Sequence, residues 1–264
     1  MSTEIKKAIL VVSFGTSFND TREKTIDVIE DEIAKAYPDF KVYRAWTSGM
    51  IINKVNKRDN IHINTVKEAM EQIKADGMEV VIIQPTHLIN GIENDLMLAD
   101  AFAYRDDFKK ILYSTPLLTT TEDNEAVLRA LKAEHADITD DEALIFMGHG
   151  STHTTNAVYA ALDYMCKDLG FDNIHIGTVE GYPELDNVMN LIKDKGYKKL
   201  RLAPLMLVAG DHANNDLAGD EEDSWKSILE KEGYTVECVV RGLGEYKGIR
   251  DVYLTHLAET MKEL

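Results

Sequence analysis

The sequence has few basic residues and no long apolar run. Its 264 residues include 29 Lys and Arg against 46 Asp and Glu, which gives a formal net charge of −17. This charge argues against general nucleic-acid binding, because that function needs a basic face that displaces counterions. The longest apolar runs, such as residues 202–210, are far too short to span a bilayer. We therefore expect neither a nucleic-acid partner nor a membrane partner.

Cysteine and proline are also scarce. The two cysteines, Cys166 and Cys238, lie far apart in unrelated motifs, so no metal-thiolate or redox spacing is present. We expect both to be small buried hydrophobes. Five prolines and sixteen glycines leave no room for a long low-complexity tract. Residues 1–7 run directly into an apolar segment without the features of a secretion signal, so we expect a cytoplasmic protein.

Short β-rich runs alternate with amphipathic helical segments along the whole chain. The predicted strands are 8–14, 41–45, 79–84, 110–114, 143–147, 174–179, 199–203 and 235–240. The predicted helices are 20–37, 65–75, 93–104, 122–134, 155–169, 184–195, 224–231 and 246–262. Eight strands that alternate with helices predict an α/β fold with parallel sheets covered on both faces.

The order of motifs repeats. The first strand leads to Gly15 and the fifth to Gly148, an offset of 133 residues, whereas Pro85 and Pro204 in the third and seventh strands are 119 residues apart. We predict two similar half-domains, residues 1–138 and 139–264, with the break near residues 136–141. Open α/β sheets bind ligands at the carboxyl ends of their strands, so a ligand is expected in a cleft between the halves.

Three predicted strands in the second half each end in a side chain that can bind a metal ion. His149, Glu180 and His212 follow the fifth, sixth and seventh strands at spacings of 31 and 32 residues. Parallel strands bring such residues to one edge of a sheet. A single His in a glycine turn, or a single Glu before a helix, is more often structural, but three at consecutive strand ends favour a site. Two imidazoles and a carboxylate suit Co²⁺, Fe²⁺, Ni²⁺ or Zn²⁺ without selecting strongly among them.

Other catalytic motifs are missing. The chain has no G-x-S-x-G elbow, no Walker loop and no G-x-G-x-x-G, and we expect no organic cofactor. A hydrolase built on Ser151 is disfavoured, because this serine lies past the turn and has no obvious base. Glu93 falls opposite His212 at the 119-residue offset and is a further catalytic candidate, with His87 a weaker one.

The segment 44–58 is the one concentrated basic stretch. If it is helical, Lys54, Lys57 and Arg58 share a face at i, i+3 and i+4. They are either a clamp for substrate carboxylates or a solvated helix face. The opposite feature, the acidic run 220–223, precedes a predicted helix, where acids are favourable on dipole grounds alone. A role in gathering metal ions is the alternative for this run.

Several motifs together resemble a known family. They are Val12–Ser17, Thr47–Ile52, Phe146–Gly150, Val179–Glu184, Pro204–Asn214 and Gly242–Glu245. The chain resembles the sirohydrochlorin cobaltochelatases of the anaerobic, early-cobalt cobalamin pathway, which are relatives of class II ferrochelatases. The resemblance implies two ferrochelatase-like halves around a cleft, a tetrapyrrole substrate, and Co²⁺ held by His149, Glu180 and His212. It also implies His149 as the proton acceptor. The chain departs from the family at Gly181, where serine is expected.

The residues also fit this chemistry by themselves. Insertion of a divalent metal into a free-base macrocycle releases two pyrrole protons, so a base of near-neutral pKa such as histidine is needed. Three alternatives stay open: an iron chelatase for sirohaem or haem, a non-catalytic tetrapyrrole or metal carrier, and a metallohydrolase with the same triad. The sequence also leaves open the physiological metal and whether the chain forms a homo-oligomer.

Overall fold

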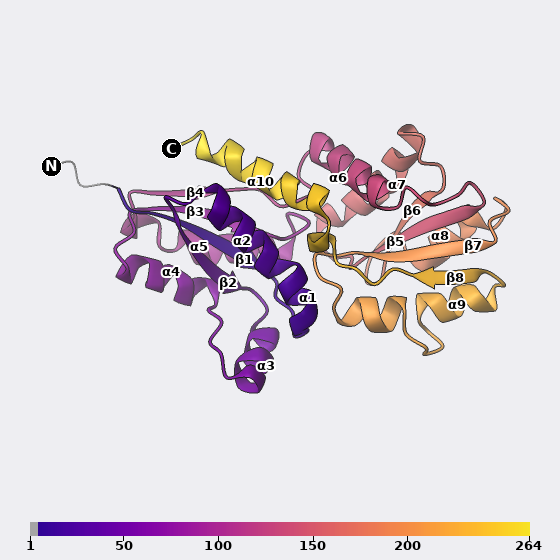
Figure 1. The fold of residues 1–264 in the computed structure, drawn as a ribbon, viewed down its shortest axis with the longest axis horizontal. Helices are drawn as coiled ribbons and strands as arrows, with labels where there is room; N and C mark the ends of the chain where they lie inside the picture. Colours follow the sequence, from indigo (N-terminus) through magenta and orange to yellow (C-terminus); the bar gives the residue numbers. More distant parts are fainter. Residues whose placement is uncertain (1–4) are drawn as a thin grey trace. The chain divides into compact units, whose positions relative to one another are not determined.

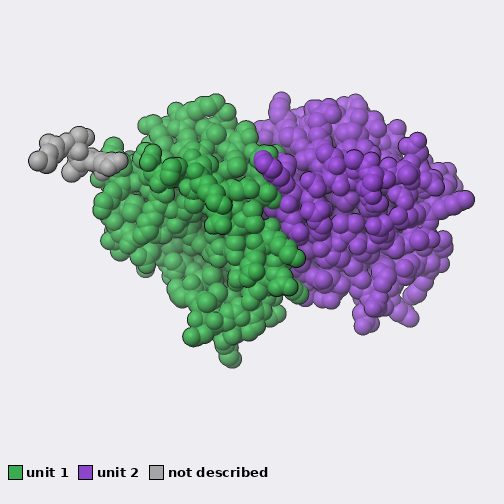
Figure 2. Space-filling view, in the orientation of Figure 1, with its two compact units in different colours: residues 1–119, 250–264 green, residues 120–249 purple. Residues whose placement is uncertain are grey.

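The structure is a computed structural model, and it describes residues 5–264. The chain divides into two compact units (Figure 2). The first unit comprises residues 1–119 and 250–264, and the second comprises residues 120–249. No helix among the described residues is long and apolar enough to cross a membrane.

The first unit is built on a four-stranded parallel sheet of order β2-β1-β3-β4 (Figure 1). Its strands are β1 (Lys7–Ser13), β2 (Lys41–Trp46), β3 (Val80–Pro85) and β4 (Lys110–Tyr113). Its helices are α1 (Asn19–Lys24), α2 (Ile26–Ala36), α3 (Gly49–Asp59), α4 (Val66–Ala75), α5 (Ile92–Phe102) and most of α10 (Lys247–Met261). The central strands β1 and β3 are buried almost throughout, which explains their continuous apolar sequences.

The second unit has a parallel sheet of order β6-β5-β7-β8. Its strands are β5 (Glu142–Gly148), β6 (Ile174–Thr178), β7 (Lys199–Leu205) and β8 (Thr235–Cys238). Its helices are α6 (Thr121–Glu134), α7 (Ala157–Asp168), α8 (Leu185–Ile192) and α9 (Trp225–Lys231), together with a π-helical turn, η3 (Ala213–Leu217). One core packs α8 and α9 against the sheet through side chains that include Val188, Trp225 and Leu229.

The two sheets have the same strand order, so the fold class and the two similar halves are confirmed. The strand register makes the equivalence specific, because Val12 pairs with Pro85 just as Met147 pairs with Pro204. Gly15 therefore corresponds to Gly150, at an offset of 135 residues, and the predicted match with Gly148 was wrong by two positions. Both glycines have left-handed φ angles, +98° and +86°. The turn requires that conformation, which only glycine adopts freely.

The unit boundaries differ from the predicted division at 138/139. Helix α6 belongs to the second unit, and the chain from Arg250 onwards belongs to the first. The Tyr253 hydroxyl on α10 donates to the Thr86 carbonyl at 2.7 Å, and Arg250 Nε donates to Glu32 Oε1 at 3.0 Å. Turn-like residues mark a local break in the chain, but they cannot reveal such long-range packing.

All eight predicted strands are present, and no strand end differs from its predicted position by more than two residues. The predicted helix 20–37 is instead two helices, because Thr25 between them leaves the helical conformation (φ −125°, ψ −82°). In the basic segment only α3 is helical; Ser48 caps its start, and left-handed Asn60 ends it. Both cysteines are free, but only Cys166 is fully buried.

Candidate metal centre

The second unit brings the three predicted metal-binding side chains together. One ligand atom from each of His149, Glu180 and His212 lies within 4.8 Å of the other two. His149 Nε2 is 3.9 Å from Glu180 Oε2, and the two imidazole rings are perpendicular with centroids 4.6 Å apart. Ligand atoms bonded to one ion at 2.0–2.2 Å lie at most roughly 4.4 Å apart, so small side-chain rotations suffice to bind a metal ion. Convergence of the triad, predicted from the strand ends, is thus observed.

Backbone hydrogen bonds beyond the strands position His149 beside Glu180. The Val179 N–H donates to the Gly148 carbonyl at 3.0 Å, and the Glu180 N–H donates to the His149 carbonyl at 2.8 Å. A Cβ on Gly150 would lie 2.5 Å from the backbone nitrogen of Gly181. The two loops therefore pack backbone to backbone, which only glycine permits.

A side chain at Gly181, where the family resemblance led us to expect serine, would displace the Asn156 side chain. A Cβ at this position would lie 2.5 Å from Asn156 Oδ1. That amide links the two loops: it accepts from the Ser151 N–H at 2.9 Å and donates to the Tyr182 carbonyl at 2.8 Å. The glycine thus allows Asn156 to hold the loops that carry His149 and Glu180.

Each imidazole has its Nδ1 engaged, which leaves Nε2 for a metal ion. His149 Nδ1 is 2.9 Å from the Gly150 carbonyl oxygen, and His212 Nδ1 is 2.8 Å from Asp216 Oδ2. In a neutral imidazole these oxygens accept the Nδ1–H, and the lone pair then resides on Nε2. The His149, Glu180 and His212 side chains are 47%, 58% and 32% exposed, so a hydrated metal ion can reach them.

The strand register shows which positions of the first unit are equivalent to the triad of the second unit. Phe14 corresponds to His149, Ser48 to Glu180 and Glu93 to His212. The Ser48 N–H donates to the Phe14 carbonyl at 3.2 Å, just as Glu180 does to His149. Glu93 lies in the first turn of α5 and is half-buried. Among residues 5–264, only the triad of the second unit forms a cluster of three or more such ligands.

His87, the weaker catalytic candidate, is a core residue. It is 9% exposed, and neither ring nitrogen has a hydrogen-bond partner among the described residues. Burial lowers the pKa of its imidazole to about 4. His87 therefore stays neutral near pH 7, and its buried imidazole is not accessible for proton transfer.

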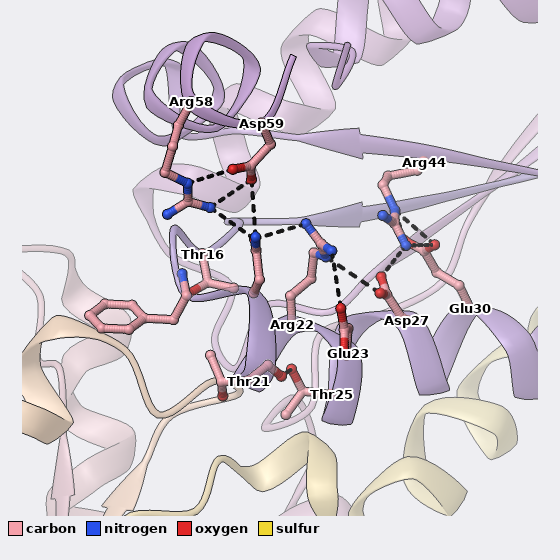
Figure 3. A network of polar contacts seen from close by, with 12 residues as sticks. Thr16, Thr21, Arg22, Glu23, Thr25, Asp27, Glu30, Arg44, Arg58 and Asp59 are labelled. Carbon is pink, nitrogen blue, oxygen red and sulfur yellow. Dashed lines mark hydrogen bonds and ion pairs between the residues drawn. The ribbon is translucent and has the colours of Figure 1, made fainter. Parts of the chain in front are cut away.

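The cations predicted to clamp carboxylates fall into two kinds. Lys54 and Lys57 on α3 are exposed, and no ion pair joins either of them to another described residue. Arg58 is instead paired with neighbouring groups. Its guanidinium donates to the Asp59 carboxylate at 2.6 Å (Figure 3). It also donates to the Ser17 carbonyl at 2.6 Å and to Asn19 Oδ1 at 2.9 Å. Arg58 also lowers the pKa of Asp59 to about 2.

Arg44, at the start of the basic segment, is also neutralised. It forms ion pairs with Asp27 and Glu30 on α2, as Figure 3 shows. The two arginines therefore hold the first unit together, and the two lysines are the side chains of this segment with ammonium groups left for a ligand.

Comparison with known proteins gives a consistent result over nearly the whole chain. The family model described as "Cobalt chelatase (CbiK)" matches residues 7–262. A sirohydrochlorin cobaltochelatase of Salmonella typhimurium is 40% identical over 257 residues, covering 97% of each chain. The sirohydrochlorin cobaltochelatase CbiKC of Nitratidesulfovibrio vulgaris is 33% identical over 262 residues, covering 98% of this chain and 92% of its own.

Solved structures show the same fold at low sequence identity. SirB from Bacillus subtilis, solved with Fe³⁺, has a TM-score of 0.66 and 13% identity, covering 97% of this chain and 96% of its own. DR2241 from Deinococcus radiodurans, described as structurally similar to chelatases, has a TM-score of 0.62 and 10% identity. It covers 97% of this chain and 55% of its own.

Proposed function

The chain belongs to the cobalt chelatase (CbiK) family, and we propose that it delivers Co²⁺ to sirohydrochlorin from His149, Glu180 and His212. Family membership makes it a metal-inserting chelatase of cobalamin biosynthesis. The assignment of residues rests on one observation: three metal-competent side chains from successive strand ends lie within 4.8 Å of one another.

The ligand set suits an ion that must be surrendered. Thiolates hold soft metal ions firmly, whereas imidazole and carboxylate ligands release an ion such as Co²⁺ more readily. Among the described residues, the cluster contains no cysteine. All three side chains are at least 32% exposed, so both the hydrated ion and a large planar substrate have access. Co²⁺ is accordingly a substrate here.

Proton release gives His149 a second task. Two pyrrole N–H bonds break as Co²⁺ forms bonds to the macrocycle nitrogens. When the ion leaves His149, the Nε2 lone pair is no longer bound to metal and accepts one of these protons. Because two protons are released, we assign Glu93, at the position equivalent to His212, as a second acceptor. Its carboxylate is half-buried at the start of α5.

We assign substrate binding to Lys54 and Lys57. Their exposed ammonium groups suit the carboxylates of sirohydrochlorin, and they lie on the helix that follows β2. Exposed apolar side chains also follow the first three strands: Phe14 after β1, Met50 after β2 and Ile92 after β3. Exposed apolar surface of this kind suits a planar macrocycle. Arg58 was predicted as a third carboxylate contact, but its local pairing supports a role in holding α3 to the loop after β1.

An insertion assay with sirohydrochlorin tests the proposed function. Co²⁺, Fe²⁺, Ni²⁺ and Zn²⁺ are supplied in parallel, and insertion is followed by the absorption spectrum of the tetrapyrrole. We expect the highest kcat/KM with Co²⁺. A higher value with Fe²⁺ would make the protein an iron chelatase, and tight binding of the metallated product without turnover would make it a carrier.

A further inference from the structure

The two histidines of the metal centre differ in the group that binds Nδ1. His212 is paired with a carboxylate, Asp216 Oδ2 at 2.8 Å, whereas His149 is paired with the neutral carbonyl of Gly150 at 2.9 Å. A hydrogen bond to an ionised acceptor is about twice as strong as one between neutral groups. It also makes the imidazole a better metal ligand at its other nitrogen. The two ligands are therefore unequal before any metal ion arrives.

Asp216 is held in place by the local backbone. It lies in η3, a π-helical turn of the kind often found at functional sites. The flanking residues Ala213 and Leu217 are fully buried and fix this turn on the core. Asn214 Nδ2 donates to the Gly210 carbonyl at 2.7 Å and ties the turn to the loop that follows β7.

Among residues 5–264, no other cation pairs with the Asp216 carboxylate. Its recorded ion pair, among the described residues, is the one with His212. It also stands outside the cluster of His149, Glu180 and His212. The carboxylate is therefore available to act through His212 and is not itself a ligand.

We propose that Asp216 is a positioning residue that keeps Nε2 of His212 aimed at Co²⁺ and makes His212 the ligand that retains the ion longest. His149, which has only a carbonyl partner, releases the ion first. This inference rests on the proposed function, because it assumes that the triad holds the Co²⁺ that is inserted.

The test is Co²⁺ binding without the tetrapyrrole, followed by the visible absorption of the bound ion. Asp216→Ala removes the acceptor, and Asp216→Asn keeps its shape but removes its charge. Loss of such a partner typically costs 10- to 100-fold in metal affinity. We expect a loss in that range for Asp216→Ala and a smaller one for Asp216→Asn, with an altered absorption spectrum in both. KM for Co²⁺ should rise while KM for sirohydrochlorin stays within about twofold.

Two controls separate positioning from a general effect. Glu221→Gln removes one exposed acidic charge five residues along the chain from Asp216 and should leave Co²⁺ affinity unchanged. In a His212→Ala background, Asp216→Asn should cause no further loss, since Asp216 is inferred to act only through His212. Because Asp216→Asn is isosteric, it decides the matter even if Asp216→Ala fails to fold.

The outcomes distinguish this inference from the proposed function. Wild-type Co²⁺ affinity in both Asp216 variants, or an equal loss in the His212→Ala background, would overturn the positioning role. If the wild-type protein binds Co²⁺ in the predicted way but inserts none into sirohydrochlorin, the proposed function fails instead.

Discussion

The two units have the same strand order and equivalent turns, yet they carry different chemistry at corresponding positions. The strand ends that hold His149, Glu180 and His212 in the second unit hold Phe14, Ser48 and Glu93 in the first. The same fold therefore carries metal-competent side chains at all three positions in the second unit and at only one of them in the first. Function here resides in the site rather than in the fold.

The two units also differ in how the turn after the first strand of each sequence half packs. Gly15 and Gly150 are both left-handed, but a Cβ on Gly15 would meet the Trp46 ring, whereas one on Gly150 would meet the backbone of residues 180 and 181. In the first unit the loop packs on a buried side chain. In the second it packs on the neighbouring loop, and this close approach brings His149 within 3.9 Å of Glu180.

The largest expected effect is the loss of His149. His149→Ala should lower kcat for Co²⁺ insertion about 10²- to 10⁴-fold, the usual contribution of a general base. The exposed side chain contributes little packing, so thermal stability and tetrapyrrole binding should barely change. His62→Ala, at an exposed histidine of the first unit, is the matched control. Near-wild-type turnover of His149→Ala would remove this residue from the mechanism.

Acidification should destabilise the second unit more than the first. Burial lowers the pKa of His135 and His175 in the second unit to about 4, as it does for His87 in the first. The unfolded chain binds these protons near the ordinary pKa of 6.5, so stability is complete above that pH and is lost as the pH falls towards 4. At pH 5 each buried histidine should cost about 2 kcal/mol.

The two tryptophans report on the units separately. Trp46 is buried in the first unit and Trp225 in the second, and the chain has no others. Urea unfolding of Trp46→Phe and Trp225→Phe at pH 7 and pH 5 then follows one unit at a time by fluorescence. We expect a loss of roughly 4 kcal/mol in the second unit and about 2 kcal/mol in the first. Equal losses would contradict the assignment of two neutral histidines to the second unit.

The paired glycines test the backbone difference. Gly150→Ala should lower Co²⁺ affinity about tenfold, because a left-handed alanine costs about 1–2 kcal/mol and its Cβ would push apart the loops of His149 and Glu180. Gly15→Ala should destabilise the protein by a similar amount but leave Co²⁺ affinity unchanged. Calorimetric titration with Co²⁺ and thermal melts of both variants make the comparison. Equal Co²⁺ affinities would show that loop spacing does not control the site.

The smallest effect concerns the lysines of the first unit. Lys54→Glu/Lys57→Glu should raise KM for sirohydrochlorin several-fold, because exposed ion pairs are worth about 0–1 kcal/mol each. Wild-type KM should also rise with ionic strength, while KM for Co²⁺ stays constant. Lys195→Glu/Lys198→Glu makes the same charge change at exposed positions of the second unit. If KM for sirohydrochlorin changes neither with ionic strength nor in the Lys54→Glu/Lys57→Glu variant, these lysines are only a solvated helix face.

The sequence predicted the parts of the molecule that depend on local pattern. Apolar runs gave the eight strands, and parallel strand ends gave the convergence of the triad. What it missed depends on contacts distant in the chain or on irregular turns. Tyr253 meets Thr86 across 167 residues, which no periodicity reveals. Asp216 reaches His212 from a π-helical turn, and the spacing of four residues between them was the only available signal.

Arg58 shows a second limit of pattern reasoning. Its spacing from Lys54 placed it on the same helix face, and charge alone suggested the same role. The structure pairs it with Asp59 and with the loop after β1 instead. A cation's availability depends on which acceptors the fold brings near it, and the sequence pattern does not contain that information.

Diffraction at the cobalt absorption edge, from crystals soaked in Co²⁺, tests the central claim most directly. We predict one anomalous peak about 2.0–2.2 Å from Nε2 of His149, Nε2 of His212 and a carboxylate oxygen of Glu180. We predict none at Phe14, Ser48 and Glu93, the equivalent positions of the first unit. A peak at those positions, or a strong peak elsewhere with the triad empty, would contradict the assignment of metal chemistry to the second unit.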